Sequence, residues 1–312
     1  MKPPQVAALL IAPLLSGFAS YASFDPAAAE PIAASAAAPA AAAAAATEHP
    51  RVYLFRGFAG VVFSRGTDKL ADEIEQAGFT ATVNEAVMCP VVVKQAIADY
   101  RTDPEPIVVI GHSVGAACAL KFSDMLGAEN IPVSLLVTTD PAKIAENVPA
   151  NVERYINVFQ SNSMLGGRDV MPGEGFQGHY ASYDILKHTE ITHINMEKNE
   201  SIHQQILSKI QQLAETPAKA QGEAVPIRYV VPADAAIELW DSGMPVFAHP
   251  GDTLQTLAMF YHVPPWSLAQ INSVPDAAPL PPGQRIIVPR HLLPFAALGD
   301  SSAATALAPP KP

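Results

Sequence analysis

The sequence predicts an α/β fold in which helices cover both faces of a mainly parallel sheet. Between residues 51 and 215, short apolar segments of strand length alternate with longer segments of helical periodicity. Such alternation is typical of parallel strands that are buried on both faces. The apolar segment Ile107–Ile110 runs directly into Gly111-His112-Ser113-Val114-Gly115 and then into an alanine-rich stretch. This order predicts a buried strand, a sharp turn at Ser113 and a helix.

The other elements of this region are expected in the same alternating order. Asp68 is placed to cap a helix that ends at Gly78. A second helix is expected around residues 91–100, a third after the turn at the serine, and a last one at about residues 200–213. The glycine-rich stretch 166–178 is irregular and is expected to border the functional site. The expected strands cover residues 52–55, 79–83, 107–110, 133–137 and 155–159.

The Gly-x-Ser-x-Gly spacing around Ser113 predicts a reactive serine. A strained strand-to-helix turn exposes the serine oxygen, and the two glycines leave room where a Cβ would collide with the neighbouring strand and helix. The helix that begins at Val114 directs the positive end of its dipole toward the serine. Ser113 is therefore the candidate nucleophile.

Residues from about Arg51 to Ala214 resemble a small α/β hydrolase without the first antiparallel hairpin and without a large lid. In that family the catalytic residues follow in the order serine, acid, histidine. The resemblance implies that the backbone N–H groups of Phe58 and Val114 stabilise the oxyanion. The oxyanion loop departs from the commoner His-Gly pair, because Arg56 takes the place of the histidine.

Two carboxylates compete for the role of the acid. Asp140 follows the fourth expected strand, and its Asp-Pro-Ala context resembles the acid site of pancreatic-type lipases. Most relatives place the acid after the next strand, where Asp169 is the candidate. A structural alternative for Asp140 is to cap the turn before Pro141. We favour Asp140, because a carboxylate at the carboxyl end of a strand can hold the tautomer of a catalytic histidine.

His193 is the candidate base, since it lies in a loop shortly before the last expected helix. His188 is too close to the preceding strand-like run, His203 falls within the helix, and His179 is expected in the glycine-rich loop. The resulting prediction is that His193 takes the Ser113 proton, the serine attacks a carbonyl, and water releases the acyl group.

Residues 245–290 form a second module with the expected order strand, helix, helix, strand. Asp252 and Gln255 suggest a capping box at the first helix, and Pro265 opens a second helix that ends at Asn272. The Gly-Asp-Thr-Leu sequence, Asn272 and a Pro-Gly-Gln turn before an apolar strand resemble a LysM module. That resemblance implies binding of N-acetylglucosamine-containing glycans such as peptidoglycan or chitin. The residues it implies at the glycan groove are Gly251, Asp252, Thr253 and Leu280.

The N-terminal segment of the chain predicts export. Residues 1–22 resemble a signal peptide, with Lys2, an apolar run and small residues before a cleavage point after Ala22. An uncleaved membrane anchor is the alternative. Alanine- and proline-rich composition predicts a tether at 23–50, a connector at 216–244 and a disordered tail at 291–312.

Composition excludes several classes of partner and cofactor. The net charge of −11 argues against nucleic acid and anionic membrane surfaces. The sequence has neither a cluster with metal-ligand spacing nor a P-loop or dinucleotide fingerprint, so no metal or cofactor is expected. Cys89 and Cys118 are the only cysteines. They are expected as buried thiols, with a disulfide as the alternative in an oxidising compartment.

These features together predict an exported serine hydrolase, periplasmic or associated with the cell wall. Its substrate would be an ester or thioester, as in lipases and carboxylesterases, and the LysM module would hold it at the wall. A rival interpretation is a non-catalytic wall-binding protein built on a degenerate hydrolase fold.

Overall fold

The computed structural model describes residues 49–58, 65–215, 222–275 and 279–293. The predicted signal segment lies outside these residues, as do nearly all of the predicted tether and tail. Within the described ranges, no helix has both the length and the apolar character needed to cross a membrane.

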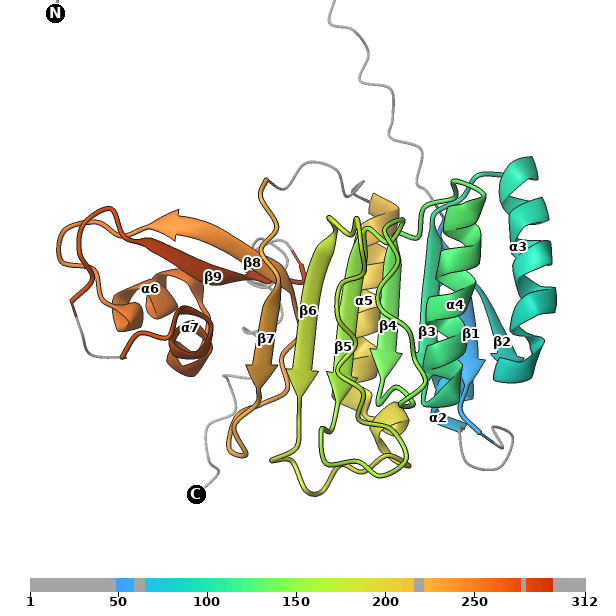
Figure 1. Cartoon of the computed structure of the whole chain (residues 1–312), viewed down its shortest axis with the longest axis horizontal. Helices are drawn as coiled ribbons and strands as arrows, with labels where there is room; N and C mark the ends of the chain where they lie inside the picture. Colours follow the sequence, from blue (N-terminus) through green and yellow to red (C-terminus); the bar gives the residue numbers. More distant parts are fainter. Residues whose placement is uncertain (1–48, 59–64, 216–221, 276–278, 294–312) are drawn as a thin grey trace, which may run out of the picture. The chain divides into compact units, whose positions relative to one another are not determined.

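A seven-stranded sheet confirms the predicted α/β class. Its strands run in the order β2-β1-β3-β4-β5-β6-β7, and every neighbouring pair is parallel (Figure 1). The strands are β1 Arg51–Arg56, β2 Thr80–Glu85, β3 Ile107–His112, β4 Leu135–Thr139, β5 Arg154–Phe159, β6 His179–Asp184 and β7 Ile227–Val230.

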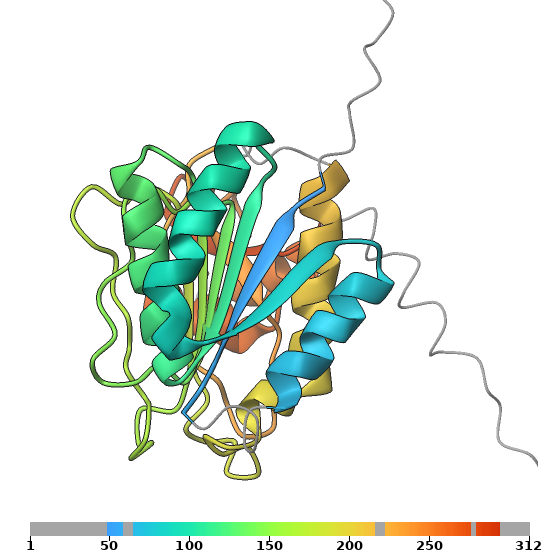
Figure 2. The ribbon, with the colours of Figure 1, turned by 90° about the vertical axis from the view of Figure 1, so that its right-hand side faces the viewer.

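Helices cover both faces of this sheet, as Figure 2 shows. On one face, α2 (Arg65–Gln76) and α5 (Glu200–Glu215) pack on alternate strand residues such as Val52, Leu54 and Val108. On the other face, α3 (Cys89–Thr102) and α4 (Val114–Ala128) pack on the intervening residues. Two short 3₁₀ helices, η1 Ala86–Met88 and η2 Met196–Lys198, precede α3 and α5.

One strand of the sheet was not expected, and another lies within the expected connector. His179, expected in the glycine-rich loop, is the first residue of β6. The strand-like run at residues 227–231 of the connector forms β7 at the edge of the sheet over residues 227–230. The sequence of β6 is polar and therefore did not suggest a buried strand. Its hydroxyl groups can be buried because they have hydrogen-bond partners inside the protein. Ser182 is hydrogen-bonded to Asn157 and Asp169, and the Tyr183 hydroxyl donates to the Trp240 carbonyl over 3.0 Å.

The C-terminal module has its own small core between an antiparallel pair of strands and two helices. These elements are β8 Trp240–Phe247, α6 Leu254–Tyr261, α7 Pro265–Asn272 and β9 Arg285–His291. Strand β8 begins five residues before the expected module boundary. Its first residues belong to the junction with the large sheet, where Asp241 forms an ion pair with Arg154 at the start of β5.

Candidate active site

Ser113 occupies the turn between β3 and α4 with φ 56° and ψ −119°. Both motif glycines are required there by close packing. A Cβ on Gly111 would lie 2.5 Å from the Gly115 carbonyl oxygen, and one on Gly115 would lie 2.1 Å from the Phe55 carbonyl oxygen. The backbone N–H of Ser113 donates to the Thr139 carbonyl of the adjacent strand. The strained turn predicted from the sequence is therefore present, and it sits at the carboxyl end of the sheet.

Asp140 follows β4 directly, with φ 41° and a fully buried side chain. Its Oδ1 accepts the Gln160 N–H over 3.0 Å, and its Oδ2 accepts the Ser163 hydroxyl over 2.7 Å and His193 Nδ1 over 2.5 Å. Burial raises the pKa of Asp140, but these hydrogen bonds outweigh burial and the net pKa lies below its ordinary value. The carboxylate is thus held in its charged form.

His193 lies in the loop before η2, and its ring is oriented by Asp140. Because the carboxylate accepts at Nδ1, the other ring nitrogen is left to interact with a hydroxyl or a leaving group. His193 and Ser113 line one cavity of about 440 Å³. The structure therefore brings Ser113, Asp140 and His193 to the same end of the sheet, where the Asp140 carboxylate is hydrogen-bonded to the His193 ring.

The walls of this cavity are mainly apolar. Phe58, whose side chain is 82 % exposed, stands at its edge, and Leu165 and Ile194 are also largely exposed there. The two predicted oxyanion donors, Phe58 and Val114, both line it. The lining residues are Gly57, Phe58, His112, Ser113, Val114, Leu165, His193 and Ile194.

The competing candidates lie in other contacts. Asp169 accepts the Ser182 hydroxyl over 3.1 Å and forms an ion pair with Arg228, so it does not serve His193. His179 contacts Asp241, and His188 contacts Glu190. His203 is buried in α5, where its Nε2 donates to the Glu197 carbonyl over 2.7 Å.

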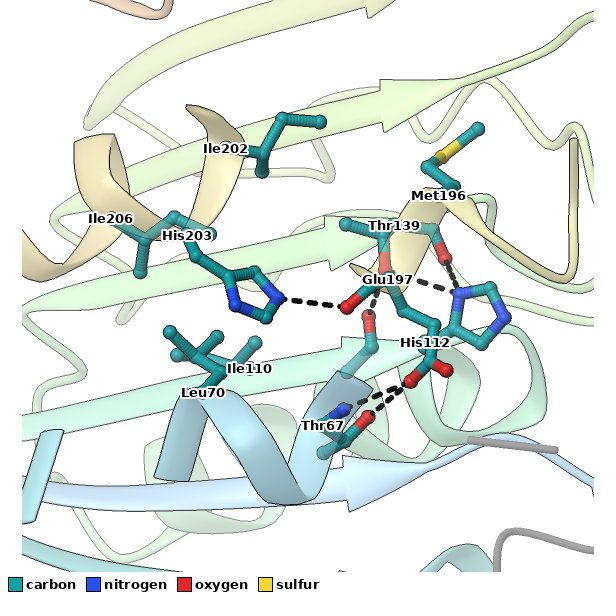
Figure 3. Close-up of a pocket in the computed structure, with 11 residues that line it drawn as sticks. Thr67, Leu70, Ile110, His112, Thr139, Met196, Glu197, Ile202, His203 and Ile206 are labelled. Carbon is teal, nitrogen blue, oxygen red and sulfur yellow. Dashed lines mark hydrogen bonds between the residues drawn. The ribbon is translucent and has the colours of Figure 1, made fainter. Parts of the chain in front are cut away.

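Glu197 takes the capping role that the sequence suggested for Asp68. Its carboxylate accepts the backbone N–H groups of Gly66 and Thr67 at the start of α2. Figure 3 shows the bond to Thr67. Asp68 lies in the first turn of α2 and pairs with Arg56 instead. The sequence could not reveal this cap, because the two partners are separated by about 130 residues.

Sequence analysis also missed three groups that support the site. Ser163 and the Gln160 N–H hold Asp140, and His112 lies against His193 with ring centroids 4.8 Å apart. Serine and glutamine are common in loops, so neither carried a signal. His112 could have been noticed, since it occupies the variable position of the Gly-x-Ser-x-Gly motif.

The cysteines are free thiols in this structure, and both are buried. The Cys89 thiol donates to the Cys118 carbonyl over 3.2 Å, between α3 and α4. Among the described residues, no group of three or more His, Cys, Asp or Glu side chains is arranged to hold a metal ion.

In the C-terminal module the cap lies one residue later than expected. Thr253 is the N-cap of α6, and its side chain and that of Thr256 form the reciprocal capping box; Gln255 takes no part. Asp252 instead accepts the His249 N–H over 2.7 Å, and its carbonyl accepts the Leu280 N–H over 2.9 Å.

The four predicted glycan-contacting residues therefore form one region of the module, but their side chains differ in availability. The Leu280 side chain is buried, so this residue can offer a ligand little beyond its backbone. The loop turns at Gly251, where φ is 91° and a Cβ would meet nothing.

Comparison with known proteins gave one family match and two remote structural matches. Residues 249–289 match the LysM domain model. The crystal structure of a proposed hydrolase of the alpha/beta superfamily from Xanthomonas campestris pv. campestris is 16 % identical, with 54 % of this chain and 98 % of that chain covered and a TM-score of 0.33. The type II thioesterase of the yersiniabactin biosynthetic pathway is also 16 % identical, with coverage of 31 % and 43 % and a TM-score of 0.23.

At these identities and TM-scores, neither structure carries an argument about this protein. The comparison with curated proteins gave no match. The described chain thus combines a seven-stranded parallel α/β fold with a C-terminal segment, residues 249–289, that matches the LysM domain model.

Proposed function

We propose that this protein is an exported serine hydrolase that cleaves an ester or thioester and is retained at the cell wall by its LysM domain. The observation that carries the proposal is the 2.5 Å hydrogen bond between Asp140 and His193 beside the cavity that Ser113 lines. Serine, imidazole and buried carboxylate in this chain order match the needs of nucleophilic acyl transfer.

The chemistry proceeds in two halves. Nε2 of His193 removes the Ser113 hydroxyl proton while Oγ attacks the substrate carbonyl carbon. The N–H groups of Phe58 and Val114 donate to the oxyanion, and His193 returns the proton to the leaving alcohol or thiol. Water then attacks the acyl-serine and gives a proton to His193. His193 passes this proton to the departing Ser113 Oγ, which releases a carboxylic acid and restores the free serine.

The cavity favours an apolar acyl group. Phe58, Leu165 and Ile194 offer apolar surface around Ser113, and burial of apolar substrate area there contributes about 25 cal/mol per Å². This lining supports a lipase- or carboxylesterase-like preference for lipid or small acyl esters. Removal of O-acyl groups from a wall glycan is a narrower version, motivated by the attached LysM domain.

Labelling with a fluorophosphonate, read by intact mass, tests the catalytic half of the proposal. We expect one adduct on the native protein and none on Ser113→Ala or His193→Ala, with Ser201→Ala, an exposed serine on α5, labelled normally. An unlabelled but folded native protein would overturn the proposal and favour the non-catalytic wall-binding role.

The wall-binding half is tested separately on the full-length protein. We expect it to sediment with insoluble peptidoglycan or chitin, and soluble N-acetylglucosamine oligomers to release it. Retention should be the same for Ser113→Ala, because the nucleophile lies outside the LysM domain. Failure to sediment with either polymer would overturn the glycan-binding assignment. Export is tested by the N-terminal sequence of the secreted form, which should begin after Ala22.

A further inference from the structure

His112 is a buried histidine whose tautomer is fixed by its neighbour. It is 5 % exposed, and its Nδ1 lies 3.0 Å from the Thr139 carbonyl oxygen and 3.1 Å from the Thr139 hydroxyl. A carbonyl oxygen can only accept, so Nδ1 of His112 carries the hydrogen. In the neutral ring, Nε2 is then unprotonated.

The ring of His112 lies directly against the ring of His193. The two centroids are 4.8 Å apart and the planes are inclined by 40°. His193 is therefore held at two places, at Nδ1 by Asp140 and on its ring by His112. The Asp140 contact fixes one atom of the imidazole, and the His112 contact restricts rotation about that hydrogen bond.

The surroundings keep His112 uncharged. Burial, and after it the neighbouring His193, lower the pKa of His112 to about 4, and Lys198 acts in the same direction. Asp140 opposes them, but its charge is shared with His193. On its other side His112 borders a cavity with room for a single water, about 20 Å³, together with Glu197 and His203 (Figure 3). The Glu197 carboxylate is occupied by the N-terminus of α2.

We propose that His112 is a positioning residue for the candidate base His193, which it holds in place with a neutral imidazole ring anchored on Thr139. This inference rests on the proposed hydrolase function. A neutral ring gives packing without adding a positive charge beside the imidazolium that forms on His193 during acyl transfer. A lysine or arginine could fill this space only by opposing that step.

Two substitutions separate the two things that His112 does. His112→Phe keeps a ring against His193 but loses the donor to Thr139. His112→Asn keeps a donor near the position of Nδ1 but loses the ring. If positioning by the ring matters, His112→Phe keeps most of the fluorophosphonate labelling rate at Ser113, whereas His112→Asn labels at least about tenfold more slowly. Thermal stability, which depends on the Thr139 hydrogen bond, should fall more in His112→Phe.

Two further readouts distinguish positioning from a merely structural role. The low-field proton resonance of His193 Nδ1–H, hydrogen-bonded to Asp140, should persist in His112→Phe and broaden in His112→Asn. The midpoint of the acidic limb of the labelling rate should be the same in wild type and His112→Phe, because a neutral His112 adds no charge to the site.

Equal labelling rates in wild type and His112→Asn would overturn the inference, as would a shifted acidic midpoint in His112→Phe. Equal losses in both variants would show that the Thr139 bond rather than the ring matters, and would also overturn it. These outcomes require a labelled wild type. An unlabelled wild type would instead overturn the proposed function itself.

Discussion

Ser163 donates its hydroxyl hydrogen to Oδ2 of Asp140 over 2.7 Å, and so shares that oxygen with Nδ1 of His193. The hydroxyl stabilises the charged carboxylate and also fixes the direction from which the histidine approaches. The backbone N–H of Gly166 donates to the same Ser163 hydroxyl over 3.1 Å, so the loop after β5 is tied to the acid.

Ser163→Ala should therefore slow the reaction of Ser113 without unfolding the protein. A hydrogen bond to a charged group contributes about 1.5–3 kcal/mol, which corresponds to a loss of roughly tenfold to a hundredfold in labelling rate. Ser161→Ala is the matched control, because Ser161 uses its backbone N–H to bind Asp184. Equal rates for the two variants would show that Ser163 does not support the acid.

Gly166→Ala should displace Asp140. A Cβ at this position would lie 2.2 Å from the Asp140 carbonyl oxygen and 2.6 Å from its Oδ2. Because the Asp140 carbonyl belongs to the backbone directly after β4, we expect the side-chain carboxylate to move and the labelling rate to fall by at least about a hundredfold.

The matched control for this substitution is Gly127→Ala at the end of α4. Its Cβ would meet the Asn151 side chain at 2.8 Å, a milder clash that lies away from the site. The control should lower the melting temperature and leave labelling unchanged. If Gly166→Ala reacts as fast as the control, Asp140 is not the acid that serves His193.

Much of the candidate site could be predicted from the sequence because its signals are local or follow chain order. The glycines around Ser113 predict a strained turn, and the structure contains this turn. Asp140 and His193 could be ranked by their places after a strand and before the last helix. Their hydrogen bond depends on a tertiary fold, and the sequence supplied only the expectation that both lie at one edge of the sheet.

The missed features depend on distant partners. Strand β6 lacks the apolar run that marks a central strand. Its polar side chains can be buried because they find distant partners: the Tyr183 hydroxyl, for example, bonds to Trp240, 57 residues away in the sequence. Two adjacent residues, Asp252 and Thr253, were both suitable caps for α6. The structure shows that Thr253 is the N-cap, whereas the Asp252 side chain accepts a hydrogen bond within the preceding turn. The sequence alone does not distinguish these two roles.

The buried ion pair between Arg154 and Asp241 predicts an acid-sensitive junction between the large sheet and β8. Burial raises the pKa of Asp241, but the hydrogen bond from His179 and the charges of Lys209 and Arg154 outweigh it and set the pKa to about 2. The unfolded carboxyl has a pKa of about 3.9. The group therefore contributes stability above the unfolded value, and this contribution is lost as pH falls from about 3.9 toward 2.

Asp241→Asn should abolish the loss of stability at acidic pH. It should also lower stability at neutral pH, because the buried Arg154 charge loses the Asp241 carboxylate. Breaking a buried pair costs about 3–5 kcal/mol. Urea unfolding at several pH values measures both effects. Glu129→Gln, which breaks the exposed pair with Arg101, is the control and should change stability by less than about 1 kcal/mol. Similar losses in the two variants would contradict a stabilising role for the junction.

The hydrogen bonds of Asn272 stabilise the packing of α7 against β9 in the LysM domain. Its side chain donates to the Ile287 carbonyl over 2.8 Å and accepts the Ile287 N–H over 2.7 Å, so it joins the end of α7 to the middle of β9. A third hydrogen bond, to the Leu268 carbonyl, fixes the amide on its own helix.

Asn272→Ala leaves the backbone groups of Ile287 without these partners, at a cost of about 1–3 kcal/mol each where they are shielded from water. We expect faster hydrogen exchange at the Ile287 amide and weaker sedimentation with peptidoglycan, while fluorophosphonate labelling of Ser113 is unchanged. Gln255→Ala is the control, because Gln255 is exposed and stands beside the capping box without joining it. Full retention on peptidoglycan together with fast hydrogen exchange at the Ile287 amide would show that glycan binding does not depend on the hydrogen bonds between Asn272 and Ile287.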